Sequence, residues 1–185
     1  MPNLPSLPRT THLGDVIKKF PKGMVHLLAL HDALLREDSE LTIAERETIA
    51  GYVSGLNGCK FCLDAHKLYA LAHGAAPDVI DAALADQNAP QVPEKLRPLL
   101  ALVSKLNTLP VEIDPADVQP SLDAGWSEAA ISDAIHICAT FNYMNRVIEG
   151  FGVNFEHPAG EPSEGELAQR RAGTYSDFAA MLGIA

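Results

Sequence analysis

The chain has 185 residues, of which 47% are hydrophobic, and a formal net charge of −10 at neutral pH. This length suits one domain that buries a substantial core without structural disulfides. The negative charge argues against nucleic acid as a partner, because affinity for a polyanion rests largely on Lys and Arg side chains. No stretch reaches the roughly 18 apolar residues that a membrane-spanning helix requires, so we expect no membrane partner.

Cysteine usage and the start of the chain indicate a cytoplasmic protein. Residues 1–8 have neither a basic start nor a continuous apolar run, so we expect no signal peptide. Two of the three cysteines form the Cys-x-x-Cys of Cys59 and Cys62, and Cys138 lies alone in an apolar stretch. A secreted disulfide framework is therefore not expected, and we expect Cys138 to be a small buried hydrophobic residue.

Helical periodicity dominates the chain, because apolar residues return every three or four positions over most of its length. The pattern, with its capping residues, Gly and Pro, predicts helices over residues 24–35, 43–56, 59–73, 77–84, 94–106, 114–125, 127–150 and 175–181. No strand alternation and no repeat are visible. The sequence thus predicts an all-α single domain over residues 1–185, with an extended arm at 1–13 and a tail at 152–185 that reaches onto a neighbouring subunit.

The segment around Cys59, Cys62 and His66 carries the clearest chemistry. Residues three or four apart are neighbours on a helix, so the two thiols can form a disulfide and Cys62 lies one turn from His66. The thiolate is the nucleophile, and a free cysteine with a pKa near 8.5 is only about 3% ionised at pH 7. A pKa lower by roughly two units, which is typical of Cys-x-x-Cys pairs, makes most of it thiolate.

Glu47 lies in the helix before the dithiol, and the tight turn at residues 56–58 predicts an antiparallel hairpin of the two helices. Counting outward from the turn places Glu47 level with His66. A carboxylate beside an imidazole raises its proton affinity, and the imidazole can then accept the proton of a thiol. Taken alone, Glu47 would be an ordinary surface acid paired with Arg46 or Lys60.

The spacing Glu47-x11-Cys59-x2-Cys62-x3-His66 resembles the signature of the AhpD-like alkylhydroperoxidases within the carboxymuconolactone decarboxylase superfamily. The amino-acid sequence of residues 57–62 strengthens the resemblance, and residues 141–153 resemble the peroxidase-related branch of the superfamily. It covers roughly residues 15 to 155 of the chain. AhpD carries a histidine immediately before its second cysteine, where this chain has Phe61.

The resemblance implies an AhpD-like all-α domain with the Cys-x-x-Cys at the start of a helix, assembled as homotrimers or homohexamers. It implies a thiol-dependent peroxidase that reduces a hydroperoxide through a dithiol–disulfide cycle, with Glu47 and His66 as proton relay and Cys59 and Cys62 as the dithiol. An external dithiol of lipoyl or thioredoxin type would regenerate the enzyme, without a cofactor or a metal.

Several alternatives stay open at this point. Two thiolates, His66 and Glu47 are natural zinc ligands, and the cysteines could also pack inertly. Helix-dipole reasoning favours Cys59 as the attacking thiol, whereas the resemblance and the neighbouring His66 favour Cys62, which we expect to attack while Cys59 resolves. A thiol sensor or interaction oligomer and a cofactor-free decarboxylase are the alternative functions. The remaining histidines singled out as structural or surface residues are His26, His31, His73 and His136.

Overall fold

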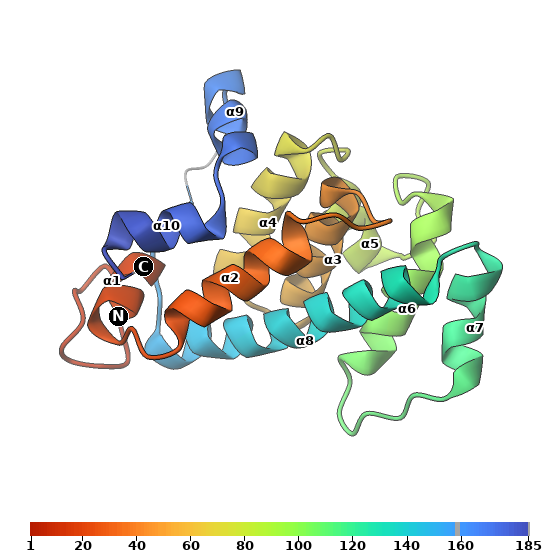
Figure 1. Ribbon diagram of the computed structural model, residues 1–185, viewed down its shortest axis with the longest axis horizontal. Helices are drawn as coiled ribbons and strands as arrows, with labels where there is room; N and C mark the ends of the chain where they lie inside the picture. The colour runs from red at the N-terminus through yellow and green to blue at the C-terminus, as the bar shows by residue number, and fades with distance from the viewer. Residues whose placement is uncertain (158–159, 185) are drawn as a thin grey trace.

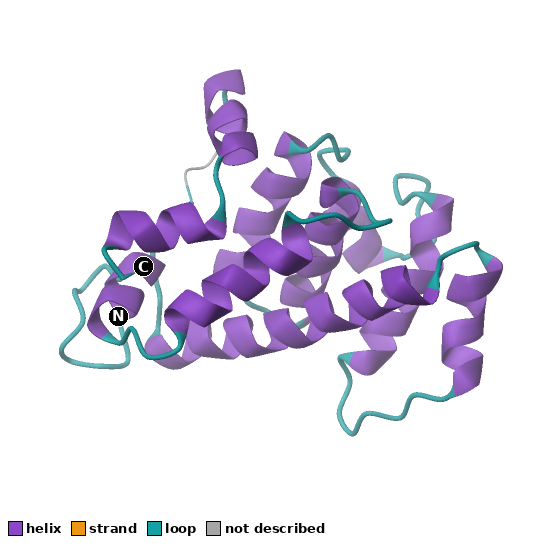
Figure 2. Ribbon diagram, viewed as in Figure 1, coloured by secondary structure: helices purple, strands orange, loops and turns teal. Residues whose placement is uncertain are grey.

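The computed structural model describes residues 1–157 and 160–184, and all regular structure in these two ranges is helical (Figures 1 and 2). The helices are α1 (Leu13–Lys19), α2 (Met24–Leu35), α3 (Ile43–Leu56), α4 (Lys60–Ala72), α5 (Val79–Ala85), the 3-10 helix η1 (Glu94–Leu96), α6 (Arg97–Leu106), α7 (Pro115–Asp123), α8 (Glu128–Phe151), α9 (Glu164–Ala172) and α10 (Tyr175–Leu182). The all-α prediction is therefore confirmed, and Cys59 immediately precedes a helix as expected.

The core forms where α2, α3 and α6 pack against α8, which runs along the long axis of the molecule (Figure 1). α3 and α4 form an antiparallel hairpin that shares the most extensive contact in the fold. Side chains such as Ile49, Leu99 and Ile137 are fully buried between these helices. Burial of each such side chain stabilises the fold by about 1.5–3 kcal/mol, so the core holds the helices that carry the candidate residues in place.

Helix ends follow local chemistry. The Thr42 hydroxyl accepts a hydrogen bond from the Glu45 backbone N–H, and the Glu45 carboxylate accepts one from the Thr42 N–H, which is a capping box that starts α3. At the start of α8, the Ser127 hydroxyl accepts a single hydrogen bond from the Ala130 backbone N–H. α8 ends at Gly152, whose φ of 67° is in the left-handed region that favours glycine.

Both terminal segments lie against the body of the same chain. The Asn3 backbone N–H donates to the Phe151 carbonyl, and Leu7 is buried. In the tail, α10 packs on α1 and α2, while α9 lies against α4 (Figure 1). The predicted arm and tail thus carry intrachain contacts, and a reach onto a neighbouring subunit stays a prediction.

Two short helices were not predicted from the sequence. α1 has only seven residues, and α9 buries none of its residues, so neither produces a strong apolar period. The signal present for α9 was the capping box of Ser163 and Glu166. In addition, α5 begins at Val79 rather than at residue 77, and the stretch from residue 94 begins as a 3-10 turn.

None of the helices in the described ranges combines the length and the apolar character needed to cross a membrane.

Candidate active site

The turn between α3 and α4 places Cys59 at the helix start. Gly58 has a φ of 70°, which favours glycine, and the Cys59 backbone N–H donates to the Ser54 carbonyl at 3.0 Å. The Asn57 amide donates to Asn145 Oδ1 at 2.9 Å and accepts from the Asn107 amide at 2.9 Å. Hydrogen bonds from α6 and α8 therefore hold the turn that orients the dithiol.

Side chains on the polar face of α8 extend this hydrogen-bond network, mainly to residues outside α8. Asn145 donates to the Ser54 hydroxyl at 3.1 Å, and Asn142 donates to Asn107 Oδ1 at 2.5 Å. Arg146 donates to Asn142 Oδ1 at 2.8 Å. This network therefore runs mainly between helices of the chain, and it anchors the wall behind the cysteines.

Both sulfurs of the pair are reduced and buried. Cys59 is 0% exposed and Cys62 is 5% exposed, so the Cys62 side chain is the one with contact to solvent. The hydrogen bond from the Cys62 thiol lowers the pKa of Cys59, and the Cys62 backbone N–H adds to this effect against the opposing influence of burial. The same hydrogen bond, together with burial, raises the pKa of Cys62. The hydrogen bonds at the start of α4 thus favour the thiolate form of Cys59, in the same direction as the helix-dipole argument.

Glu47 and His66 are in direct contact across the hairpin. Glu47 Oε2 lies 2.5 Å from His66 Nδ1, and the two side chains are 0% and 5% exposed. Glu47 Oε1 accepts a second hydrogen bond, from Arg36 Nη1 at 2.5 Å. The structure thus places Glu47 level with His66, as the hairpin geometry required, and adds a guanidinium that the sequence argument did not include.

The charges around Glu47 keep its carboxylate ionised despite complete burial. Burial alone would raise the pKa of Glu47, but the charge of His66, the hydrogen bond from His66 and the interactions with Arg36 outweigh it and lower the pKa. The ionised Glu47 accepts the hydrogen bond that His66 Nδ1–H donates, so Nε2 is the ring nitrogen that Glu47 does not engage. His66 is therefore oriented for proton exchange through Nε2.

The surface pairings considered for Glu47 do not occur. Arg46 donates from Nη1 to the Leu34 and Glu37 carbonyls, and Lys60 forms an ion pair with Asp64 on the exposed side of α4. Glu47 is instead the only acid in the described ranges that is 0% exposed as a whole residue. Burying a charge without a partner costs much free energy, so a fully buried and paired carboxylate is a specific feature of this fold.

Gly51 lets the two helices approach closely beside the relay. A Cβ at Gly51 would lie 3.2 Å from His66 Cβ and 2.6 Å from Ile80 Cδ1. Glu47 and Gly51 are one turn apart on α3, so the missing side chain allows His66 to come within reach of the carboxylate. No pattern in the sequence indicated this role of Gly51.

Aromatic side chains enclose the relay. The His66 ring meets Phe141 edge-on at 4.3 Å and Tyr69 at 6.3 Å between centroids. His31, buried and bonded through Nδ1 to the Leu27 carbonyl at 2.7 Å, contacts both Phe141 and Tyr175. Burial lowers the pKa of His31, which favours its neutral form and a structural role in this wall.

Arg36 and Tyr175 are the residues at this site that sequence reasoning missed. Arg36 Cζ lies 5.3 Å from the centroid of the Tyr69 ring and 5.2 Å from that of Tyr175. Arg36 ends α2, and Tyr175 begins α10 at the far end of the chain. No fixed spacing connects them to the Cys-x-x-Cys, so only the folded chain brings them together.

The donor set for the zinc alternative is not assembled. In residues 1–157 and 160–184, no three His, Cys, Asp or Glu side chains converge in a way that could hold a metal ion. His66 uses Nδ1 on Glu47, and Glu47 uses both oxygens on cationic partners. The polar atoms that zinc would need are thus engaged with each other.

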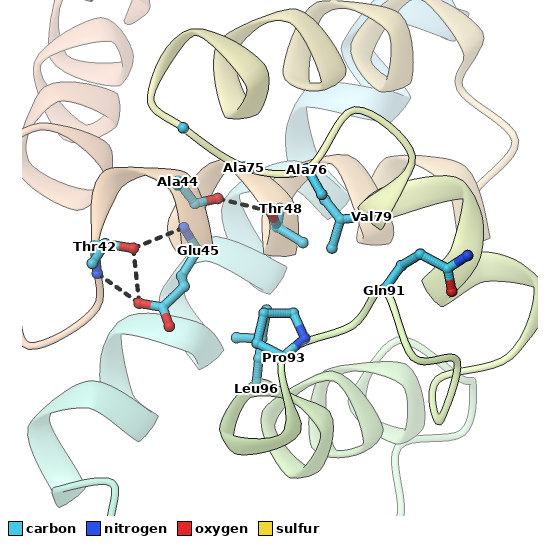
Figure 3. Close-up of a pocket in the computed structure, with 11 residues that line it drawn as sticks. Thr42, Ala44, Glu45, Thr48, Ala75, Ala76, Val79, Gln91, Pro93 and Leu96 are labelled. Carbon is cyan, nitrogen blue, oxygen red and sulfur yellow. Dashed lines mark hydrogen bonds between the residues drawn. The ribbon is translucent and has the colours of Figure 1, made fainter.

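A separate pocket of about 250 Å³ lies between the start of α3 and the segments that flank α5 (Figure 3). Thr42 and Glu45 line it, but their side chains are engaged in the capping box of α3, and Thr48 donates to the Ala44 carbonyl at 2.8 Å. It contains none of the four predicted site residues, so we do not assign the chemistry to it.

The comparisons with known proteins agree with this fold. Residues 21–94, which include the dithiol and the relay, match the family "Carboxymuconolactone decarboxylase family". This match, and two solved structures named as peroxidase-related proteins, support the resemblance to the AhpD and carboxymuconolactone decarboxylase superfamily. No curated protein matches the sequence.

Three solved structures illustrate the likeness. An uncharacterized peroxidase-related protein with an alkylhydroperoxidase AhpD core, from Ralstonia eutropha JMP134, has a TM-score of 0.70 and 25% identity over 85% of this chain and 80% of its own. An uncharacterized peroxidase-related protein from Silicibacter sp. TM1040 has a TM-score of 0.67 and 25% identity over 75% of this chain and 74% of its own. A protein of unknown function from Agrobacterium tumefaciens, described as a candidate AhpD antioxidant defence protein, shares the fold with a TM-score of 0.68 at 23% identity, over 79% of this chain and 97% of its own.

Proposed function

We propose that the protein reduces hydroperoxides through a dithiol–disulfide cycle of Cys59 and Cys62, with His66 as the acid–base group and Glu47 as its positioning partner. The observation that carries the proposal is the 2.5 Å contact between Glu47 and His66, one helical turn from a buried dithiol at the start of α4. A carboxylate, an imidazole and an activated thiol pair are the groups that thiol-based peroxide chemistry needs.

The first step depends on which cysteine the peroxide can reach and on which thiol carries the proton. Cys62 is the residue of the pair with some exposure to solvent, and the lowered pKa of Cys59 favours Cys59 as the resting thiolate of the proposed cycle. As peroxide approaches, the proton of Cys62 passes to Cys59 along their hydrogen bond, and the Cys62 sulfur attacks one peroxide oxygen. The O–O bond breaks, Cys62 becomes a sulfenic acid, and the other oxygen leaves as an alcohol after taking the Nε2 proton of the His66 imidazolium, which becomes a neutral imidazole.

The second step closes the cycle on the protein. The Cys59 sulfur attacks the sulfenic sulfur, a Cys59–Cys62 disulfide forms, and the hydroxyl of the sulfenic acid leaves as water. An external dithiol of lipoyl or thioredoxin type then reduces the disulfide, which requires two electrons and two protons. Phe61, which stands where AhpD has a histidine, leaves His66 as the acid–base group of this cycle.

The deciding experiment is intact mass spectrometry of the reduced protein after one equivalent of hydroperoxide. We expect a loss of two mass units without dimerisation, the signature of an internal disulfide. The Cys59→Ser variant should hold a sulfenic acid on Cys62 that a dimedone-type probe traps, and Cys62→Ser should not consume peroxide. Cys138→Ser serves as the matched control, because burial raises the pKa of Cys138 to about 11 and keeps it a thiol.

The outcomes separate the alternatives. Probe labelling of Cys59 in the Cys62→Ser protein, with peroxide still consumed, would reverse the assignment of the attacking thiol. Peroxide consumption that persists without both cysteines would remove the redox proposal. Disulfide formation without turnover in the presence of lipoyl or thioredoxin dithiols would favour the thiol sensor over the peroxidase.

A further inference from the structure

Arg36 and Tyr175 carry hydrogen-bond donors that no group in the described ranges uses. Arg36 Nη1 donates to Glu47, but Arg36 Nε and Nη2 are buried without a partner, and so is the Tyr175 hydroxyl. The Arg36 side chain is only 10% exposed. Buried polar groups in native proteins nearly always have a partner, so three unpaired donor atoms on two adjacent side chains are unusual.

These donors lie beside the relay rather than elsewhere in the core. Arg36 contacts Glu47 directly, Glu47 contacts His66, and the Tyr175 ring lies 5.2 Å from the Arg36 guanidinium carbon. Burial raises the pKa of Tyr175, and the charge of Glu47 adds to this effect against the opposing charge of Arg36. The phenol therefore keeps its proton and can act as a donor.

The position of Tyr175 is fixed from two sides. The backbone N–H groups of Tyr175 and Ser176 donate to the two Asp32 carboxylate oxygens at 2.7 Å each, and the Ser176 hydroxyl donates to Asp32 as well. Arg171, in the preceding helix, donates from Nη1 to the Ala72 carbonyl at the end of α4. The start of α10 is thus attached to α2, and α9 to the helix that bears the cysteines.

We propose that Arg36 and Tyr175 form an oxyanion site that binds the peroxide oxygen that leaves when the Cys62 sulfur attacks. This assignment rests on the proposed peroxidase function and adds to it the residues that recognise the reacting group. Donors without acceptors suit an oxygen that gains negative charge, and a guanidinium with two uncommitted nitrogens stabilises that charge best.

The electron and proton balance follows directly. The sulfur donates an electron pair to one peroxide oxygen, and the O–O pair moves onto the second oxygen, which becomes an alkoxide. Arg36 and Tyr175 hydrogen-bond to this alkoxide while it forms, and His66 gives it a proton to release the alcohol. The sulfur is oxidised to the sulfenic acid and the peroxide is reduced.

The test compares two reactions of the same thiol in single turnover. Alkylation by iodoacetamide needs the nucleophile but expels iodide, whereas reduction of tert-butyl hydroperoxide also needs stabilisation of a leaving oxygen. In Tyr175→Phe we expect the peroxide rate to fall about a hundredfold while the alkylation rate stays within about twofold of the wild type. Tyr143→Phe, on the exposed face of α8, is the matched control and should change neither rate.

A purely structural role predicts a different pattern. The lost hydroxyl makes no hydrogen bond in the described ranges, so the melting temperature of Tyr175→Phe should not fall. An unchanged peroxide rate, or equal losses in both reactions, would overturn the oxyanion assignment and leave the peroxidase intact. A wild type that is alkylated but does not react with the peroxide would overturn the proposed function and this assignment together.

Discussion

Glu47→Gln tests the buried charge network most directly. The substitution keeps the shape of the side chain but removes the negative charge that faces Arg36 at 2.5 Å and His66 at 2.5 Å. It leaves Arg36, whose side chain is only 10% exposed, without a counter-ion. Breaking a buried ion pair by removing one partner typically costs about 3–5 kcal/mol.

This loss is large enough to measure without ambiguity. For a chain of 185 residues, each kcal/mol shifts the melting temperature by about 2–4 °C, so we expect a fall of roughly 6–20 °C. Urea denaturation at pH 7 should give the same loss as a free energy of unfolding. Glu112→Gln, in an exposed loop, removes the same charge and should change stability by less than about 0.5 kcal/mol.

The pH dependence provides an independent check. His66 and Arg36 hold the pKa of Glu47 below its usual range, so the folded carboxylate loses its proton more readily than the unfolded one. Its contribution is complete above the unfolded-state pKa of about 4.3 and is lost as the pH falls through the lower folded-state pKa. The wild type should therefore lose stability on acidification more steeply than Glu47→Gln.

A double variant completes the argument. When Arg36→Met accompanies Glu47→Gln, no buried charge is left uncompensated, and part of the lost stability should return. If Glu47→Gln stays within about 1 kcal/mol of the wild type, or if the double variant is simply the sum of two losses, the carboxylate is not the counter-ion we describe.

Further outcomes concern the relay and the surface. His66→Ala should lower the peroxide rate about a hundredfold and raise the apparent thiol pKa, and pH profiles of alkylation that match the wild type would contradict this. Gly51→Ala should raise the same apparent pKa, because its Cβ would lie 3.2 Å from His66 Cβ and displace the imidazole. The higher helix propensity of Ala offsets the cost to stability by about 1 kcal/mol. An unchanged pH profile of alkylation would show that His66 keeps its place. We also expect a homo-oligomer, because Leu109 and Tyr143 are 73% and 50% exposed along an apolar groove of about 430 Å³. Sedimentation at 19.8 kDa would contradict it, and Leu109→Glu should shift the protein toward that mass.

The sequence was informative wherever a local rule decides the geometry. The turn at Asn57 and Gly58 fixes the register of α3 against α4, so counting residues outward from it was enough to pair Glu47 with His66. The apolar periods predicted the long helices of the core for the same reason. Caps and turns act over a few residues, and the sequence shows them directly.

The remaining part of the site depends on tertiary packing. Arg36 sits at the end of α2, where a charged residue is ordinary, and its partner Glu47 is on another helix. Tyr175 reaches the site because Asp32 binds the start of α10, a contact between residues 143 positions apart. No periodicity encodes such a pair, so both residues could be found only in the folded chain.

The unequal burial of the two sulfurs also bears on how the oxidised protein is regenerated. In the proposed cycle, an incoming reductant meets the disulfide at Cys62, because Cys59 has no exposed surface. A mixed disulfide would then form on Cys62, and Cys59 would depart as the leaving group. Thiol–disulfide exchange is faster when the departing thiol has a lower pKa, and the hydrogen bond from the Cys62 backbone N–H, which a mixed disulfide on Cys62 leaves in place, lowers the pKa of Cys59. The inner cysteine would thus set the speed of recycling, and the outer one the choice of reductant.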